Sequence, residues 1–221
     1  MTPTTPKQQF NAQFALIAQA LASPQRLEIL DYLAQTERSV EELAQLACLT
    51  VANTSRHLQT LKQAALVHVR TDGKHRRYRL AGDDVVQLIT SLRRTAELHL
   101  AEVKRLAHTY LTDKQAMEAI NAEELLARLT RNEVTLLDVR PYAEYAAGHI
   151  PGAIHIPPDA VGEHLQNLDD QKTIVAYCRG AYCVYAFHAV QTLRKQGITA
   201  LRLAHGLPEW RAAGFPIQTL H

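Results

Sequence analysis

The sequence predicts two domains: an α+β domain with a helix-turn-helix unit over residues 1–111, and an α/β domain with a mainly parallel sheet over residues 118–221. In the first part, two short helical segments joined by about three residues are followed by a β-hairpin pattern. In the second part, short apolar strands alternate with helical segments, which is typical of parallel sheets with right-handed crossovers. The chain has 221 residues, of which 47% are hydrophobic, so it can build two cores.

Charge is distributed unevenly between the two parts. Residues 1–111 hold 14 Lys and Arg against 10 Asp and Glu, whereas residues 112–221 hold 10 against 12. The first part is therefore the candidate for binding a polyanion. No run approaches the roughly 20 apolar residues that cross a membrane, and no apolar leader opens the chain, so we expect a cytoplasmic protein without a membrane partner. The three cysteines are expected to be free, catalytic or redox-active.

The chain begins with a predicted amphipathic helix. Its apolar residues recur at steps of four, three and four: Phe10, Phe14, Ile17 and Leu21. Ser23 and Pro24 begin a second helix. A third helix begins near Ser39, whose hydroxyl forms a capping box with Glu42.

A tight turn at residues 48–50 leads into a helix over residues 51–64, and these two helices form a helix-turn-helix unit. Leu58 and Leu61 are expected to face the core. The polar side chains would then face solvent, as on most helices, or a DNA groove: Asn53, Thr54, Ser55, Arg56, His57, Gln59 and Lys62.

Two strands around an Asp-Gly turn follow, with cations that outnumber the single acid Asp72. These cations are Arg70, Lys74, Arg76, Arg77 and Arg79. A basic hairpin beside a polar helix is typical of a wing that grips the DNA backbone next to a helix that reads a groove.

Residues 8–110 resemble the ArsR family of winged helix-turn-helix repressors. The motif NTSRHLQTL at residues 53–61, with ALV at 65–67, GK at 73–74 and YRL at 78–80, carries the resemblance. It implies a homodimer that binds double-stranded DNA at a near-palindromic operator. It also implies contacts of Ser55, Arg56, His57 and Gln59 with bases or phosphates, and of Arg76 and Arg77 with phosphates.

The sequence departs from the metal-sensing members of this family. The start of the third helix has no paired cysteines, and on the last helix His99 and Glu102 lack an Asp-x-His partner. We therefore predict no metal site and no cofactor. Cys48 occupies a turn position where such motifs usually have glycine, which indicates either backbone strain or a redox thiol; the unreactive interpretation is favoured.

A single long helix is predicted over residues 83–110, with an apolar stripe that includes Leu88, Leu92 and Leu106. With the N-terminal helix, this stripe should form a two-fold dimer interface. Residues 112–115 make a short link without glycine or proline. In the second part we expect a helix from 121 or 122 to 130, strands at 133–139, 153–156, 174–177 and 200–203, and helices at 141–147 and 184–196.

Cys178 follows a buried strand and precedes a helix, where backbone N–H groups and the helix dipole lower a thiol pKa. The alternative is a small buried hydrophobe. A cysteine phosphatase would need an arginine six residues after its nucleophile, and Val184 stands there. Asp138 and Arg140 end a neighbouring strand and either orient the site or form a structural pair, Arg140 with Glu144.

Residues 118–221 resemble a rhodanese domain, with LLDVR at 136–140, Glu144, GHIPGA at 148–153, CRGAYC at 178–183 and GLPEWRAAGFP at 206–216. The resemblance implies an α/β rhodanese-like fold and a persulfide on Cys178, held by the backbone amides of the loop residues Arg179, Gly180, Ala181, Tyr182 and Cys183. Cys183 stands where an arginine is frequent, which puts ordinary thiosulfate turnover in doubt.

The leading hypothesis is a DNA-binding repressor that responds to reactive sulfur, in which Cys178 accepts sulfur from a small donor and Cys183 is either a resolving thiol or a substituted loop residue. The first alternative is a sulfurtransferase that the DNA-binding domain only localises. The second is a metal or arsenic sensor with an inert rhodanese domain.

Overall fold

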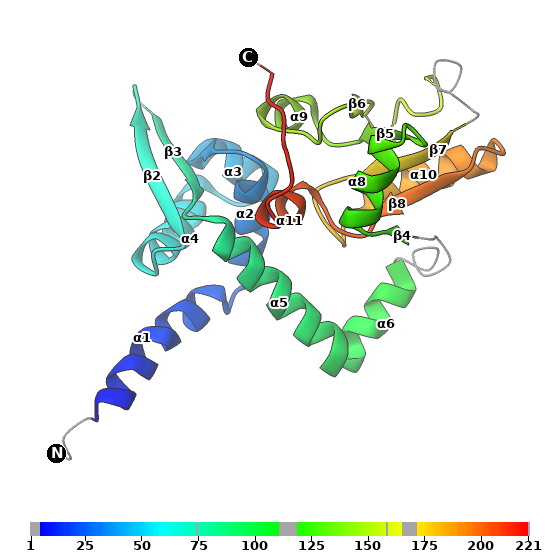
Figure 1. The fold of residues 1–221 in the computed structure, drawn as a ribbon. Helices are drawn as coiled ribbons and strands as arrows, with labels where there is room; N and C mark the ends of the chain where they lie inside the picture. The colour runs from blue at the N-terminus through cyan, green and yellow to red at the C-terminus, as the bar shows by residue number, and fades with distance from the viewer. Residues whose placement is uncertain (1–4, 74, 111–118, 158, 165–171, 221) are drawn as a thin grey trace. The chain divides into compact units, whose positions relative to one another are not determined.

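The structure is a computed structural model that describes residues 5–73, 75–110, 119–157, 159–164 and 172–220 (Figure 1). The chain divides into two units, residues 1–85 and 86–221. Lys74 and the predicted link at residues 112–115 lie outside the described residues. No helix in the described ranges is both long and apolar enough to cross a lipid bilayer.

The first unit is mainly helical with a small antiparallel sheet. Its elements are α1 (Pro6–Leu21), α2 (Pro24–Gln35), β1 (Arg38–Ser39), α3 (Val40–Leu46), α4 (Val51–Gln63), β2 (Val67–Asp72) and β3 (His75–Leu80). The capping box of Ser39 and Glu42 is confirmed: Ser39 Oγ accepts the Glu42 N–H, and the Glu42 carboxylate accepts the Ser39 N–H. The strand order is β1-β3-β2, and the two-residue strand β1 was not predicted.

The core of the first unit lies where the helices cover one face of the hairpin. Its fully buried residues include Ile29, Leu30, Leu43, Leu58 and Leu61. Tyr78 and Leu80 on β3 are also buried, whereas the residues toward the hairpin turn are exposed. The hairpin is therefore anchored at its base, and its tip extends into solvent.

The prediction of one continuous helix over residues 83–110 was wrong. The structure has α5 (Asp83–His99) and α6 (Ala101–Tyr110), with an interruption at Leu100 that no glycine or proline explains (Figure 1). Parts of the predicted apolar stripe are exposed, at Leu88, Leu92 and Leu106. On α1, Phe10 and Phe14 are 64% and 67% exposed, so these helices leave large apolar side chains uncovered in the monomer.

The α/β part of the second unit is a five-stranded parallel sheet, as the alternation of strands and helices predicted. Its elements are β4 (Ala119–Ile120), α8 (Ala122–Thr130), β5 (Val134–Asp138), α9 (Tyr142–Ala147), β6 (Ile154–His155), β7 (Thr173–Tyr177), α10 (Val184–Lys195), β8 (Ala200–Leu203) and α11 (Leu207–Ala212). The strand order is β4-β8-β7-β5-β6, and every pair is parallel. Among the strands of this sheet, the two-residue β4 was not predicted.

Each face of this sheet is covered by a cluster of buried apolar side chains. On β7, Ile174 and Ala176 face the cluster that contains α10, whereas Val175 and Tyr177 face the cluster that contains α8 and α11. Side chains alternate along a strand, so the next residue, Cys178, is directed to the α10 face. The strand register thus decides which side of the sheet receives the cysteine.

Candidate functional site

Helix α4 presents one polar face because its other face is fixed in the core. Thr50 Oγ1 accepts a hydrogen bond from the Asn53 N–H at 3.2 Å and caps the helix. Leu58 and Leu61 are fully buried. The predicted DNA-contacting residues whose side chains are at least partly exposed are Asn53, Ser55, Arg56, His57, Gln59 and Lys62.

The prediction that Thr54 contacts DNA was wrong. Its side chain is fully buried, and its hydroxyl donates to the Thr50 carbonyl at 3.0 Å. The signal was present in the sequence, because Thr54, Leu58 and Leu61 are spaced by four and three residues and therefore share a helix face. Thr54 packs this face rather than reading DNA.

His57 lies on the partly exposed face of α4. Its pKa lies below the usual value because burial disfavours the charged ring and because Arg26 and Arg56 add positive charge nearby. A neutral imidazole has one donor and one acceptor, which suits a base edge, whereas a phosphate contact would favour the imidazolium.

The basic hairpin places several of its cations against acids. Arg70 lies directly opposite Arg77. Arg70 Nε donates to Glu37 at 3.0 Å, and Arg77 Nε donates to Asp72 at 3.1 Å. Exposed pairs of this kind contribute little stability, so a DNA phosphate can replace the carboxylate.

Among the other predicted cations of the hairpin, Arg76 and Arg79 have exposed side chains. Arg76 lies opposite Thr71, one step along the strand from the Arg70–Arg77 pair. By strand alternation, Arg76 is thus directed to the other face of the ribbon. The hairpin therefore offers positive charge on both faces.

Cys48 has a left-handed backbone, with φ of 52°. This confirms the conformation expected at a turn position usually held by glycine. Its thiol is free and exposed.

Cys178 follows β7 and is 2% exposed, in a cluster with Ile174, Ala176 and Phe187. The structure joins its sulfur to Cys183, the N-cap residue of α10, with a Cα–Cα distance of 6.2 Å. That distance lies within the range that disulfides span. The Cys183 N–H donates to the Gly180 carbonyl at 3.1 Å, so this amide closes the loop on itself. The two cysteines of the loop are thus within bonding reach, a point that the sequence left open.

The side chain of the loop residue Arg179 is paired with a buried acid. Its Nε and Nη2 donate to the two carboxylate oxygens of Glu144 at 2.9 and 2.7 Å, and Glu144 is fully buried. The Arg179 guanidinium also lies over the Tyr185 ring, 5.7 Å from its centroid. The arginine therefore ties the loop to α9 and α10, and Glu144 offsets its charge.

Asp138 and Arg140 form a fully buried pair at the end of β5. The Arg140 guanidinium donates to Asp138 at 2.5 and 3.0 Å and to the Gly148 carbonyl at 2.6 Å. Tyr177 donates its hydroxyl to Asp138 at 2.6 Å. Burial, followed by the charge of Asp138, raises the Tyr177 pKa. The structure thus shows both residues in a buried polar network at the strand ends, in which Asp138 binds the side chains of Arg140 and Tyr177.

Gly206 packs directly against the backbone of the cysteine loop, a contact that was not predicted. A Cβ on Gly206 would lie 2.3 to 2.4 Å from backbone atoms of Arg179 and Gly180. The following N–H, of Leu207, donates to the Cys178 carbonyl at 3.3 Å. Only glycine permits this close approach, and its place at the head of the GLPEWRAAGFP motif was the available signal.

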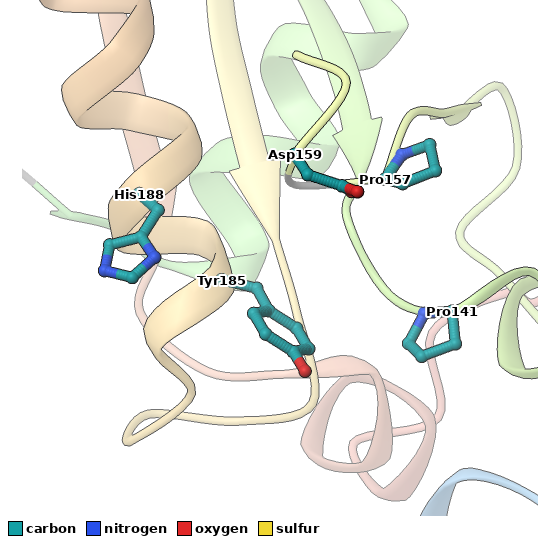
Figure 2. Close-up of a pocket in the computed structure, with 5 residues that line it drawn as sticks. All are labelled: Pro141, Pro157, Asp159, Tyr185 and His188. Atoms are coloured by element: carbon teal, nitrogen blue, oxygen red, sulfur yellow. The ribbon is translucent and has the colours of Figure 1, made fainter.

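A pocket of about 490 Å³ lies at the N-terminal end of α10, and it too was not predicted. Its described lining is Pro141, Pro157, Asp159, Tyr185 and His188 (Figure 2). Pro141 follows the carboxyl end of β5, and Pro157 and Asp159 follow that of β6, at the rim where ligands bind in parallel sheets. Tyr185 and His188 lie on α10. Within the described ranges, no group of three or more His, Cys, Asp or Glu side chains could hold a metal ion.

Two family models match separate stretches of the chain. Residues 23–69 match the bacterial regulatory protein, arsR family, and residues 121–213 match the rhodanese-like domain. The chain is 46% identical over 205 residues to the HTH-type transcriptional regulator Rv0324 of Mycobacterium tuberculosis, across 93% of this chain and 90% of that protein.

Two further matches each cover one part of the chain. A sulfurtransferase of Allochromatium vinosum is 33% identical over 100 residues, across 44% of this chain and 92% of that protein. The NMR structure of a homodimeric winged helix-turn-helix DNA-binding domain from Mycobacterium bovis is 37% identical, covers 46% of this chain and 94% of that chain, and has a TM-score of 0.42.

Proposed function

We propose that this chain, a transcriptional regulator that belongs to the ArsR family and carries a C-terminal rhodanese-like domain, is a repressor whose operator binding responds to reactive sulfur at Cys178. The observation that carries the proposal is the bond between Cys178 and Cys183 within a six-residue loop. Two cysteines at this separation can capture a sulfur atom and then release it.

The proposed chemistry has two balanced steps. First, the Cys178 thiolate attacks the terminal sulfur of a persulfide R–S–SH. The S–S bond of the donor breaks and R–SH leaves with the proton, so that Cys178 carries the transferred sulfur. Second, the Cys183 thiol attacks the sulfur of Cys178; the disulfide forms and the outer sulfur leaves as hydrogen sulfide. The two cysteines are oxidised, and the transferred sulfur is reduced to sulfide.

On the DNA side, we infer a homodimer that binds a near-palindromic operator in double-stranded DNA. The exposed apolar residues of α1, α5 and α6, including Phe10, Phe14 and Leu92, would meet the same helices of a second copy. Each copy would then direct the polar face of α4 into the major groove and the basic hairpin along the backbone. The repressor is expected to act in the cytoplasm.

The test combines mass spectrometry with a DNA mobility shift. Reduced protein is treated with polysulfide, and the Cys178 and Cys183 peptides are then identified. We expect a bridged loop in the wild type and a Cys178 persulfide in Cys183→Ser. Operator DNA should be released only from protein in which Cys178 has been modified. A protein that is fully modified at Cys178 yet binds DNA with unchanged affinity would refute the coupling.

A second candidate is a sulfurtransferase whose DNA-binding domain serves to localise it. The match to the Allochromatium sulfurtransferase across most of that protein favours it. Transfer of sulfur to cyanide in the steady state separates the two: an enzyme should turn over at about one per second or faster. A sensor needs only one round of modification.

A further inference from the structure

We infer that the pocket lined by Pro141, Pro157, Asp159, Tyr185 and His188 binds the carrier of the incoming sulfur, and that this carrier is a small organic persulfide bearing an ammonium group. The inference rests on the proposed function, because it names the donor for Cys178. It differs from a site for an inorganic sulfur anion such as thiosulfate.

The position of the pocket connects it to the cysteine loop. Tyr185 lies two residues after Cys183, in the first turn of α10, and packs against the apolar cluster that contains Cys178. The same ring lies against the Arg179 guanidinium of the loop. Figure 2 shows Tyr185 on the helix, with Pro141 and Asp159 on loops across from it. A molecule in the pocket therefore contacts the Tyr185 ring, which also packs against the cysteine site.

The size and walls of the pocket favour an organic molecule. Its volume of about 490 Å³ lies within the usual range for small-molecule sites. Two proline rings and a tyrosine ring offer apolar surface to a carbon chain. Thiosulfate has no carbon chain to bury against them.

The charges around the pocket favour a cation over an anion. Asp159 supplies a carboxylate, and none of the described lining residues is Lys or Arg. The two arginines of the adjacent loops are each bound to a buried acid, Arg179 to Glu144 and Arg140 to Asp138. An anionic donor would thus approach the Asp159 carboxylate and two arginines whose charges are balanced by buried acids. An ammonium group would instead gain a partner in Asp159.

The test compares donors of opposite charge on the full chain. Reduced Cys183→Ser protein, in which a persulfide on Cys178 cannot be resolved, is mixed with the persulfide of cysteamine, the persulfide of mercaptopropionate, or thiosulfate. Mass spectrometry follows the addition of one sulfur to Cys178. We expect cysteamine persulfide to load about fivefold faster than mercaptopropionate persulfide at low ionic strength, and the difference to shrink with added salt.

Two further variants test whether Asp159 causes the preference for cysteamine persulfide. Asp159→Asn keeps the size of the side chain and should abolish the preference, whereas Glu163→Gln, an exposed acid on the same segment outside the described lining, should keep it. Equal loading by the two organic donors, faster loading by thiosulfate, or loss of the preference in Glu163→Gln would each overturn the inference.

An unreactive ligand separates the pocket from the chemistry. S-methylcysteamine cannot donate sulfur, but it should shift the NMR signals of His188 and Tyr185 in the reduced full chain. If it shifts them while no donor loads Cys178, the pocket stands and the proposed sulfur chemistry fails. If it leaves them unchanged, the pocket assignment fails.

Discussion

Replacing Arg179 by Ala should destabilise the rhodanese-like part strongly, because it leaves the Glu144 carboxylate buried without its main partner. Glu144 is fully buried, and Arg179 donates to both of its oxygens. Breaking a buried ion pair from one side costs about 3 to 5 kcal/mol. The Arg179 side chain is 19% exposed, so water can partly replace it, and we expect the lower end, about 3 kcal/mol.

The assay uses the single tryptophan of the chain. Trp210 lies in α11 and is 1% exposed, so its fluorescence reports the unfolding of this part alone. Urea unfolding of reduced wild type, Arg179→Ala, Glu144→Gln and the double variant gives a coupling energy for the pair. We expect a coupling of about 2 kcal/mol. If Arg179→Ala lowers the free energy of unfolding by less than about 1 kcal/mol, or if the two single effects simply add in the double variant, the pair does not hold the loop.

Three other predictions concern the loop and the DNA-binding surface. Gly206→Ala should cost about 1 to 3 kcal/mol because its Cβ would meet the loop backbone; urea unfolding checks this, and Gly162→Ala, where a Cβ meets only ordinary contacts, should change stability little. A thiol reductant should attack Cys183 rather than Cys178, which is almost fully buried. Partial reduction followed by alkylation should therefore leave the reductant as a mixed disulfide on Cys183 and the alkyl group on Cys178; the reverse pattern would contradict this prediction. Arg76→Ala should lower the slope of log affinity for DNA against log salt by about one, and an unchanged slope would remove Arg76 from the phosphate contacts.

Local patterns in the sequence predicted most of the fold. The Ser39 capping box, the Asp-Gly hairpin and the apolar run of β7 each depend on neighbours in the chain, and each is present in the structure. The two-residue strands β1 and β4 were missed because they are too short to show a period. The interruption at Leu100 has no glycine or proline to mark it.

The candidate site was harder to predict because its partners are distant in sequence. The spacing of Arg140 and Glu144 gave no sign that the Glu144 carboxylate binds Arg179, 35 residues away. The role of Gly206 behind the loop likewise depends on a tertiary approach. The bond between Cys178 and Cys183 depends on loop geometry that spacing alone leaves open.

The affinity of the full chain for its operator in two defined states tests the central claim most directly. One sample has Cys178 and Cys183 fully reduced, and the other has them fully bridged, with Cys48 replaced by Ser in both. We predict that the bridged protein binds at least about tenfold more weakly, as expected for coupling between two distant sites. Dissociation constants within a factor of about two would mean that the chemistry of the loop does not reach the DNA.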